Sequence, residues 1–473
     1  MERKRDIIVK KTENSKNSSF TTSLGFVLAA AGSAVGLGNI WRFPYLAAKN
    51  GGVFILVYII LAFTFGFALL TTDIAIGRKT GKSALDAYGE ISKKWKFVGV
   101  LSFIVPAIIL SYYGVVGGWI VKYLVSYITS SGAALAQDGY FSGFITSPFA
   151  PIFYMLLFIA ATAFVVYNGV EKGIEKFSKI IMPGLIVMII GISIFSISLT
   201  HEAEGGEVRR GIEGMLIYFK PDFTGLSVSK FIQIVLDAMC QLFYSLSVAM
   251  GIMITYGSYV EKDTNLGKSV TQIELFDTGV AILAGLMIVP AVYVFSGMEG
   301  MTEGAGLMFV ALPKIFDQMG FLGRIVGVVF FIMVLFAALT SSVSIMETIV
   351  AGVMQKTGKS RKKVSLIIFI IFIALSVIVC MGYNVLYFSI TLPNGTVGQI
   401  LDVLDYLSNY LIMPVISIST CILIGWLKKP DYIIEEMESS GHKFGRKKLY
   451  SVMIKYIAPI SMLVLLLKAL GLF

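Results

Sequence analysis

An apolar segment at residues 21–45 is longer than the roughly 20 residues that a helix needs to cross a bilayer. Its second half, residues 32–44, reads GSAVGLGNIWRFP and holds three glycines, an asparagine and an arginine. Irregular backbone inside a membrane persists only where protein buries it or where it lines a water-filled cavity. Polar side chains at that depth mark a functional site by default. The segment therefore predicts a broken membrane helix that contributes to a binding site.

Apolar segments of similar length recur along the whole chain. Only 14% of the residues are charged and 56% are hydrophobic, whereas soluble domains carry about 25% charged residues. The eleven segments fall near 21–45, 52–77, 97–128, 149–167, 174–199, 230–259, 269–296, 321–355, 364–383, 397–426 and 450–472. We therefore predict an all-α membrane protein with eleven transmembrane helices.

The net charge of +10 is distributed as a membrane topology requires, so it does not indicate nucleic acid binding. Of the 39 Lys and Arg residues, 29 lie in alternate connections on one predicted side. Those segments are 1–19, 78–96, 168–179, 260–268, 356–363 and 427–455. Positive residues accumulate on the cytoplasmic side. We expect a multi-pass protein of the plasma (inner) membrane with its N-terminus in the cytoplasm and its C-terminus outside. The basic N-terminal tail has no apolar core of the kind that a signal peptide needs.

A second interruption lies in the sixth segment, where residues 243–251 read FYSLSVAMG. The two breaks are five helices apart, an odd number, so the halves that contain them would have opposite orientations. Paired broken helices in two halves point to a transporter site at the middle of the membrane. Glycine packing seams in ordinary helices are the alternative. We expect a cytoplasmic tail at 1–19 and one transporter domain at 20–473. Its parts are repeat one at about 20–200, repeat two at about 230–426 and an extra helix at about 450–472.

The residue types at the breaks suit a sodium ion and a zwitterion. Unwound carbonyls, hydroxyls and amides supply the oxygen ligands that replace the water around a hard cation. Helix ends at a break add partial charges, with N-termini favouring a carboxylate and C-termini favouring an ammonium group.

The chain resembles the neurotransmitter:sodium symporter family, in its bacterial amino acid transporter branch with a leucine-transporter-like fold. The resemblance rests on residues 32–44, on Arg78 after the second segment and on Thr340-Ser341-Ser342 in the eighth. It implies two sodium sites. The first would use the Ala34 carbonyl, the side chains of Asn39, Ser245 and Asp277, and the carboxylate of the substrate. The second would use the carbonyls of Gly32, Val35 and Ala337 with the hydroxyls of Thr340 and Ser341. Hydrogen bonding of the hydroxyls to carbonyls one turn earlier is the alternative for the last pair.

The same resemblance implies a substrate pocket. Its residues would be Ala34, Gly36, Ile109, Tyr113, Tyr244, Ser247, Met250, Ser341 and Ile345. Tyr113 would donate its hydroxyl to the substrate carboxylate. Monoamine members of the family carry an aspartate where this chain has Gly36, so an amino acid is expected here. Met250 and Ile345 favour a large hydrophobic or aromatic side chain, because methionine repacks readily.

Asp277 departs from the chloride-dependent members, which place an asparagine there and a serine at the position of Ala281. A permanent carboxylate would offset the charge of two sodium ions and a zwitterion in a low-dielectric site. We therefore expect sodium ions, two in number, and no chloride. An acid at a solvated helix end is the alternative.

The resemblance implies a residue pair for the extracellular gate but none for the cytoplasmic gate. Arg42 and Asp405 would form the extracellular ion pair, with Asp402 as the competing acid. The cytoplasmic gate of the family has no match. The aligned residues are Asn17, Phe20 and Gln355, and the other candidates are Lys16 and Tyr259. Glu347 either assists sodium release or pairs with a basic neighbour.

Other classes of protein fit the sequence less well. An enzyme is not expected, because the two histidines, His201 and His442, fall in loops and no catalytic motif lies in the spans. A channel would need a continuous filter or a ring of charges. The sequence therefore predicts a sodium-coupled amino acid symporter in a lipid bilayer. A transporter-fold sensor, or a symporter of another small molecule, is the alternative, and the oligomeric state is left open.

Overall fold

The structure is a computed structural model that describes residues 19–130, 132–202, 206–302 and 304–472. The β-structure of the described residues consists of two short antiparallel pairs of strands. Strand β1 (Thr200–Glu202) pairs with β2 (Val208–Arg210), and β3 (Ile390–Thr391) pairs with β4 (Val397–Gly398). Everything else of regular structure is helical, with η marking a 3₁₀ or π turn.

The helices of the first half lie between Ser23 and Ser198. They are α2 (Ser23–Ala34), η1 (Gly38–Arg42), α3 (Phe43–Leu61), η2 (Ala62–Gly66), α4 (Phe67–Thr80), α5 (Ala84–Ile91), η3 (Lys93–Trp95), α6 (Lys96–Thr129), η4 (Ala133–Ala136), α7 (Tyr140–Thr146), α8 (Ala150–Tyr167), η5 (Val170–Glu175) and α9 (Lys176–Ser198).

The second half continues in the same manner to the end of the described chain. Its helices are α10 (Gly211–Phe219), α11 (Val228–Ser245), α12 (Ile252–Gly257), α13 (Leu266–Ser296), η6 (Met298–Gly300), η7 (Leu307–Ala311), α14 (Leu312–Gln318), α15 (Phe321–Thr357), α16 (Arg361–Met381), α17 (Ile400–Asp405), η8 (Tyr406–Ile412), α18 (Met413–Ile422), η9 (Leu423–Leu427), α19 (Asp431–Glu438), α20 (Lys447–Val452), η10 (Met453–Ile457) and α21 (Ala458–Ala469).

Within the described residues, nine helical stretches are apolar and long enough to cross a bilayer. They are Gly38–Thr80, Lys93–Thr129, Ala150–Tyr167, Val170–Ser198, Leu266–Ser296, Phe321–Thr357, Arg361–Met381, Ile400–Leu427 and Lys447–Ala469. The predicted segments 21–45 and 230–259 have no continuous helix of their own, because each is interrupted by non-helical backbone. The fold is thus a multi-pass helical membrane protein.

The stretch Gly38–Thr80 is not one straight helix. Gly51 has a φ of 62° and a ψ of −160°, which only glycine adopts readily. The next residue, Gly52, lies against the chain after α10, where an added Cβ would come within 2.3 Å of the Phe219 carbonyl oxygen. The kink therefore separates the end of the first predicted segment from the start of the second.

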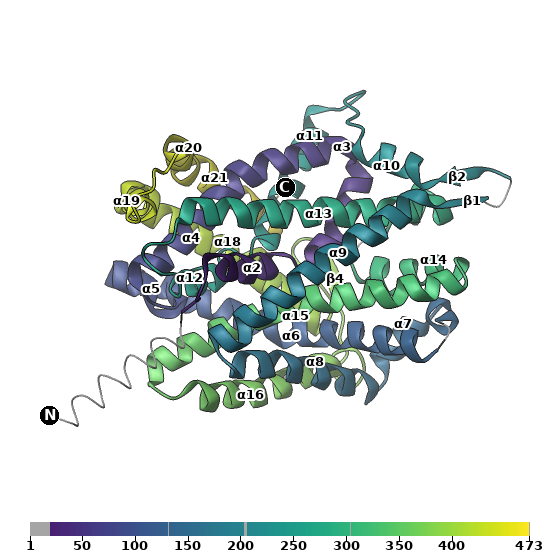
Figure 1. Ribbon diagram of the computed structural model, residues 1–473, viewed down its shortest axis with the longest axis horizontal. Coiled ribbons are helices and arrows are strands. Elements are labelled where there is room, and N and C mark those ends of the chain that lie inside the picture. Colours follow the sequence, from purple (N-terminus) through teal and green to yellow (C-terminus); the bar gives the residue numbers. More distant parts are fainter. Residues whose placement is uncertain (1–18, 131, 203–205, 303, 473) are drawn as a thin grey trace.

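Helix α2 lies in the middle of the bundle and packs on α9, α13 and α15 (Figure 1). Ten of its twelve residues are buried, and most of them are alanine, glycine or serine. Small residues let membrane helices approach closely. At Gly32, an added Cβ would lie 3.2 Å from both the Met182 sulfur and the Thr340 Cβ. Close packing therefore fixes α2 against α15 just before the first break.

Candidate functional site

The two breaks face each other in the interior. Helix α2 ends because Val35 adopts an extended conformation with a ψ of 93°. After α11, the backbone at Ser247 and Ala249 has positive φ angles of 54° and 60°. Such conformations cost non-glycine residues on the order of 1–3 kcal/mol and persist where the surroundings enforce them, which happens most often at functional sites.

Serine side chains connect the two breaks. The Ser247 hydroxyl donates to the Ser33 carbonyl at 2.9 Å, and the Ser33 hydroxyl donates to the Ser247 oxygen at 3.1 Å. The Ser341 hydroxyl, from α15, donates to the same Ser33 carbonyl at 3.1 Å. The irregular backbone is thus held by buried polar contacts between the two breaks and α15.

A buried carboxylate, Asp277 of α13, gathers the predicted residues of the first sodium site. Its Oδ1 atom accepts hydrogen bonds from the Asn39 amide at 2.8 Å and from the Ser245 hydroxyl at 2.5 Å. Tyr58 reaches its other oxygen at 3.5 Å. Ala34, the fourth predicted residue, is buried at the end of α2. Amide, hydroxyl and carboxylate oxygens are hard donors, so this set fits a sodium ion.

The residues of the second predicted sodium site lie between α2 and α15, and all five are buried. The Thr340 hydroxyl donates to the carbonyls of Phe336 and Ala337, both at 3.0 Å. This is the alternative contact that the sequence left open for Thr340, whereas Ser341 reaches across to the first break. Donation leaves the hydroxyl lone pairs free, so the Thr340 and Ser341 oxygens still fit a cation.

A cavity of about 500 Å³ lies directly beside these groups. It is bounded by both breaks, by α6 and α15, and by α17 with η8. All nine residues of the predicted substrate pocket line it: Ala34, Gly36, Ile109, Tyr113, Tyr244, Ser247, Met250, Ser341 and Ile345. The volume lies within the range of roughly 300–1,000 Å³ that is typical of small-molecule sites.

Gly36 and Tyr113 shape the polar end of this central cavity. A Cβ added at Gly36 would lie 3.0 Å from the Ser341 hydroxyl oxygen and 3.7 Å from the Tyr113 hydroxyl oxygen. The Tyr113 hydroxyl is buried and has no hydrogen-bond partner within the described part of the chain. A buried polar atom without a partner costs about 1–3 kcal/mol. The geometry thus leaves room for a ligand oxygen at Tyr113.

The predicted extracellular pair is not in contact in this conformation. Arg42 and Asp405 both line the central cavity, but no ion pair joins them within the described residues. Asp405 instead accepts hydrogen bonds from Tyr112 at 2.9 Å and from Asn409 at 2.6 Å. The Arg42 guanidinium lies 5.0 Å from the centre of the Tyr244 ring. Asp402, the competing acid, accepts from the Gln399 backbone and caps α17.

At the end of the molecule predicted to be cytoplasmic, the contacts differ from those of the family pattern. Phe20 is buried against the ring of Tyr259, whose hydroxyl donates to Glu347 at 2.6 Å. Arg361 binds both oxygens of Glu347, at 2.5 and 2.9 Å, so Glu347 has a basic partner. Gln355 accepts from Ser83 rather than from a gate residue. Lys16 and Asn17 lie outside the described residues.

Sequence reasoning missed several residues of the site. Ser33 holds both breaks, and Tyr58 reaches Asp277. Asp73 of α4 is also buried, and it accepts a hydrogen bond from the Ala249 backbone at 3.0 Å. The signal for Asp73 was present, because it is the lone acid in the apolar segment 52–77. Ser33 and Tyr58 gave no such signal, since serine and tyrosine are common in packed membrane helices.

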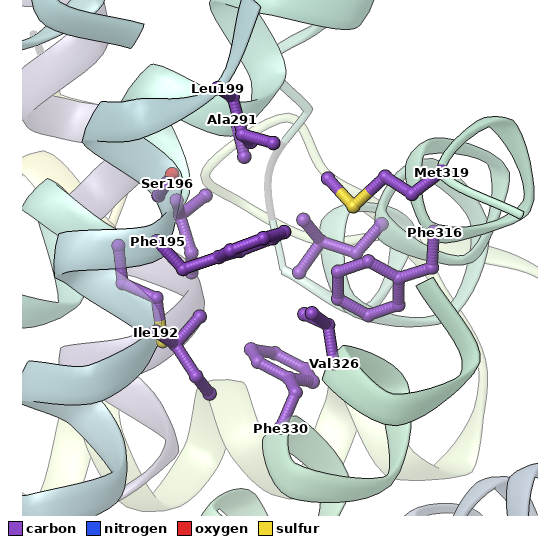
Figure 2. A pocket seen from close by; sticks show the side chains of 12 residues that line it. Ile192, Phe195, Ser196, Leu199, Ala291, Phe316, Met319, Val326 and Phe330 are labelled. Carbon is purple, nitrogen blue, oxygen red and sulfur yellow. The ribbon is translucent and has the colours of Figure 1, made fainter. Parts of the chain in front are cut away.

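A smaller void is not a site for a ligand. It measures about 10 Å³ and lies among α9, α13, α14 and α15. Figure 2 shows Phe195 extending from one wall towards Phe316 and Phe330 on the other. Ser196 is the lone polar residue among its lining side chains. Such a volume holds about one water molecule at most.

Comparison with known proteins decides the family. The model of the sodium:neurotransmitter symporter family matches residues 17–136 and 144–472. This chain belongs to the sodium:neurotransmitter symporter family. The membership makes it a transporter rather than an enzyme, and the bacterial relatives are named sodium-dependent transporters.

The relatives of this transporter match it over nearly its full length. The uncharacterized sodium-dependent transporter YhdH of Bacillus subtilis (strain 168) is 32% identical over 96% of this chain and 97% of its own. A second uncharacterized sodium-dependent transporter, from Haemophilus influenzae (strain ATCC 51907 / DSM 11121 / KW20 / Rd), is 30% identical over 96% of this chain and 98% of its own. The crystal structure of MhsT in complex with L-phenylalanine is similar with a TM-score of 0.81, at 36% identity over 96% of this chain and 99% of that chain. The fold is therefore the one shared by MhsT.

Proposed function

We propose that this protein is a sodium-coupled amino acid symporter that works by alternating access, with a preference for large hydrophobic or aromatic substrates. The observation that supports it most is the central cavity, because all nine predicted substrate residues line it beside the Asp277 cluster. The complex of the similar MhsT with L-phenylalanine supports the substrate class. Within this proposal the chain has eleven transmembrane helices, ten of them in two inverted repeats of five.

The substrate would lie with its carboxylate towards Tyr113 and the first break. Gly36 supports an amino acid, since a longer side chain there would occupy the space beside the Tyr113 and Ser341 oxygens. Met250 and Ile345 supply an apolar wall for the substrate side chain. The negative charge of Asp277 would replace chloride as the counter-charge of the sodium ions.

In this proposal two sodium ions bind. One would be held by the oxygens around Asp277, and the other by the oxygens between α2 and α15. Sodium binding would favour the conformation seen here, in which Arg42 and Asp405 are apart. Substrate binding would then allow this extracellular pair to form, and the Tyr259–Glu347–Arg361 contacts would have to separate for inward release. A ligand shifts such an equilibrium only by its difference in affinity for the two states. With the N-terminus in the cytoplasm, the C-terminus would lie outside.

Direct binding tests this proposal before any transport assay. Radiolabelled L-phenylalanine is added to the purified protein in detergent with sodium chloride, sodium gluconate or choline chloride. We expect saturable binding with both sodium salts and a loss of at least about tenfold in affinity with choline, because the carboxylate would lose its cation. An unlabelled amino acid panel then ranks the substrates. Binding that is equal with and without sodium would contradict the proposal.

A sensor that binds but does not transport is the second candidate, because a fold alone does not fix function. It would show the same sodium-dependent binding and no uptake into proteoliposomes.

A further inference from the structure

A second carboxylate of α13, Glu274, is buried near Asp277 but does not line the central cavity. It lies three residues before Asp277, so the two positions are neighbours on the helix, about 4.5 Å apart along its axis. The Glu274 side chain is fully buried, and its Oε2 atom accepts a hydrogen bond from Arg446 at 3.1 Å. Its Oε1 atom is buried without a hydrogen-bond partner among the described residues. The carboxylate therefore depends on the Arg446 guanidinium for compensation of its charge.

Arg446 comes from a distant part of the chain and also contacts a second membrane-length stretch. It directly precedes α20, which lies at the end of the molecule where α4 ends and α13 begins (Figure 1). Its Nη1 atom donates to the Phe63 carbonyl at 3.4 Å, and its guanidinium carbon lies 3.5 Å from the centre of the Phe67 ring. Its Nη2 atom donates to the Thr271 hydroxyl at 2.8 Å. One guanidinium thus joins η2 and α4 to α13.

The two elements that Arg446 joins carry opposite sides of the group of side chains around Asp277. Tyr58 lies five residues before Phe63 in the same helical stretch, and its hydroxyl is 3.5 Å from the Asp277 Oδ2 atom. Asp277 itself follows Glu274 by about one turn of α13. Because a packed interior transmits small shifts from one element to the next, the Arg446 contacts affect how Tyr58 and Asp277 face each other.

We propose that Arg446 and Glu274 are positioning residues for the first sodium site, an inference that rests on the proposed function. Neither residue lines the central cavity, so neither contacts the bound ion. The pair holds α13 against η2 and thereby keeps the Asp277 carboxylate among its hydrogen-bond partners. Loss of the pair leaves every proposed sodium ligand in the chain but aligns these ligands less well. Sodium affinity then falls.

Charge removal distinguishes this positioning role from two simpler explanations. Arg446→Gln leaves the buried Glu274 carboxylate without a partner, whereas the double variant Arg446→Gln/Glu274→Gln removes both charges together. The double variant therefore loses less stability than the single one, but it lacks the tether equally. A purely electrostatic effect has the opposite sign, because Arg446→Gln alone adds net negative charge near the site and would tighten sodium binding.

The experiment measures the sodium concentration that gives half of the sodium-induced rise in melting temperature. The full chain is purified in detergent, sodium is the added ligand, and choline replaces it at constant chloride without any amino acid. A ligand that binds the native state raises its stability with concentration, so this midpoint reports sodium affinity. The matched control is Arg78→Gln, which breaks another buried arginine–glutamate pair without contacting the residues around Asp277.

We expect the sodium midpoint to rise about tenfold in Arg446→Gln and in the double variant, within the range typical of coupling between two sites. Arg446→Lys keeps the ion pair but not the forked contacts, so its midpoint should rise less. Arg78→Gln should lower the melting temperature and leave the midpoint unchanged. At saturating sodium, the affinity of the double variant for L-phenylalanine should return to the wild-type value, because no ligand has been removed.

Three results would overturn the positioning role while the wild-type chain responds to sodium. They are an unchanged midpoint in the double variant, a lower midpoint in Arg446→Gln, and an equal rise in the Arg78→Gln control. The double variant carries no unpaired buried charge from this pair, so the test stands even if Arg446→Gln alone does not fold. Absence of any sodium response in the wild-type chain would instead refute the proposed function, and the positioning role with it.

Discussion

Some polar side chains of the site have hydrogen-bond partners within the described residues, and others have none. Asp277 belongs to the first kind, with Asn39 and Ser245 on one oxygen and Tyr58 near the other. The Tyr113 hydroxyl belongs to the second kind. The two kinds predict opposite effects of mutation on stability and on ligand binding.

Asp277→Asn keeps the size of the side chain and removes its charge. Because hydrogen bonds to a charged group contribute about 1.5–3 kcal/mol, we expect sodium-driven uptake in chloride-free medium to fall at least about tenfold. Added chloride should restore part of the uptake if it replaces the lost charge. Uptake is measured in proteoliposomes with sodium chloride and with sodium gluconate. Unchanged uptake in gluconate would refute the role of Asp277 as the counter-charge.

Tyr113→Phe removes a hydroxyl that has no partner in the described structure. We expect the affinity for L-phenylalanine to fall about tenfold, the value of one hydrogen bond to a charged group. The melting temperature in the absence of substrate should not fall, since no native hydrogen bond is lost. A marked loss of thermal stability, with affinity unchanged, would mean that the hydroxyl serves packing rather than the substrate.

At the scale of elements, the break after α11 is the part with the most unusual backbone. Gly251 directly precedes α12 with a φ of 74°, and an added Cβ would lie 2.6 Å from the Ala84 Cβ and 2.7 Å from the Ser102 carbonyl oxygen. The turn therefore requires glycine for its conformation and for its close contact with α5 and α6.

Gly251→Ala should destabilise the protein by about 2–4 kcal/mol, from the left-handed backbone and from the overlap. The matched control is Gly279→Ala in α13, because an added Cβ there meets no atom within 4 Å. That change should be neutral or stabilising by up to about 1 kcal/mol. Thermal unfolding in detergent compares the two variants. Equal melting temperatures would show that the break tolerates a side chain.

The connection after residue 427, predicted to be cytoplasmic, is fixed to the bundle by a buried ion pair. Arg78 of α4 binds Glu436 of α19 at 2.8 Å, and the Arg78 side chain is fully buried. Arg78 also donates to the Glu436 and Thr264 carbonyls and to the Ser439 hydroxyl. One arginine thus joins the end of the second predicted span to the connections that hold Thr264 and Glu436.

Arg78→Gln removes the buried partner of Glu436 and leaves the carboxylate with the exposed Lys262 amine at 2.9 Å. We therefore expect a loss of about 3 kcal/mol in stability, at the lower end of the range for a broken buried ion pair. Lys314→Gln removes one member of an exposed ion pair with Asp138 and should cost no more than about 1 kcal/mol. Limited proteolysis of the connector, together with the melting temperature, measures both effects. Similar results for the two variants would contradict the structural role of Arg78.

At the scale of the whole molecule, the sequence predicted the membrane class, the two breaks and the residues around the central cavity. These followed from local patterns: apolar length, glycines inside a span, and a family motif. Contacts between distant segments could not be read in the same way. Gly51 turns the chain without any proline to mark it, and Asp405 binds Tyr112 rather than Arg42.

Under the proposed alternating access, contact between Arg42 and Asp405 would depend on the conformational state, which the sequence does not specify. The same holds for the side that is predicted to be cytoplasmic. There the positive charge comes from Arg361, which binds Glu347, whereas the sequence candidates were Lys16 and Tyr259. For Glu347 the sequence left open a role in sodium release or a pair with a basic residue. Its contact with Arg361 became evident only from the structure.

The central claim is sodium-coupled transport of an amino acid, and uptake under a sodium gradient tests it most directly. Proteoliposomes with the wild-type chain are given an inward sodium gradient and a panel of radiolabelled amino acids, with chloride or with gluconate. We predict accumulation of large hydrophobic or aromatic amino acids, abolished when a sodium ionophore removes the gradient and unchanged without chloride. Sodium-dependent binding with no accumulation of any amino acid would contradict the claim.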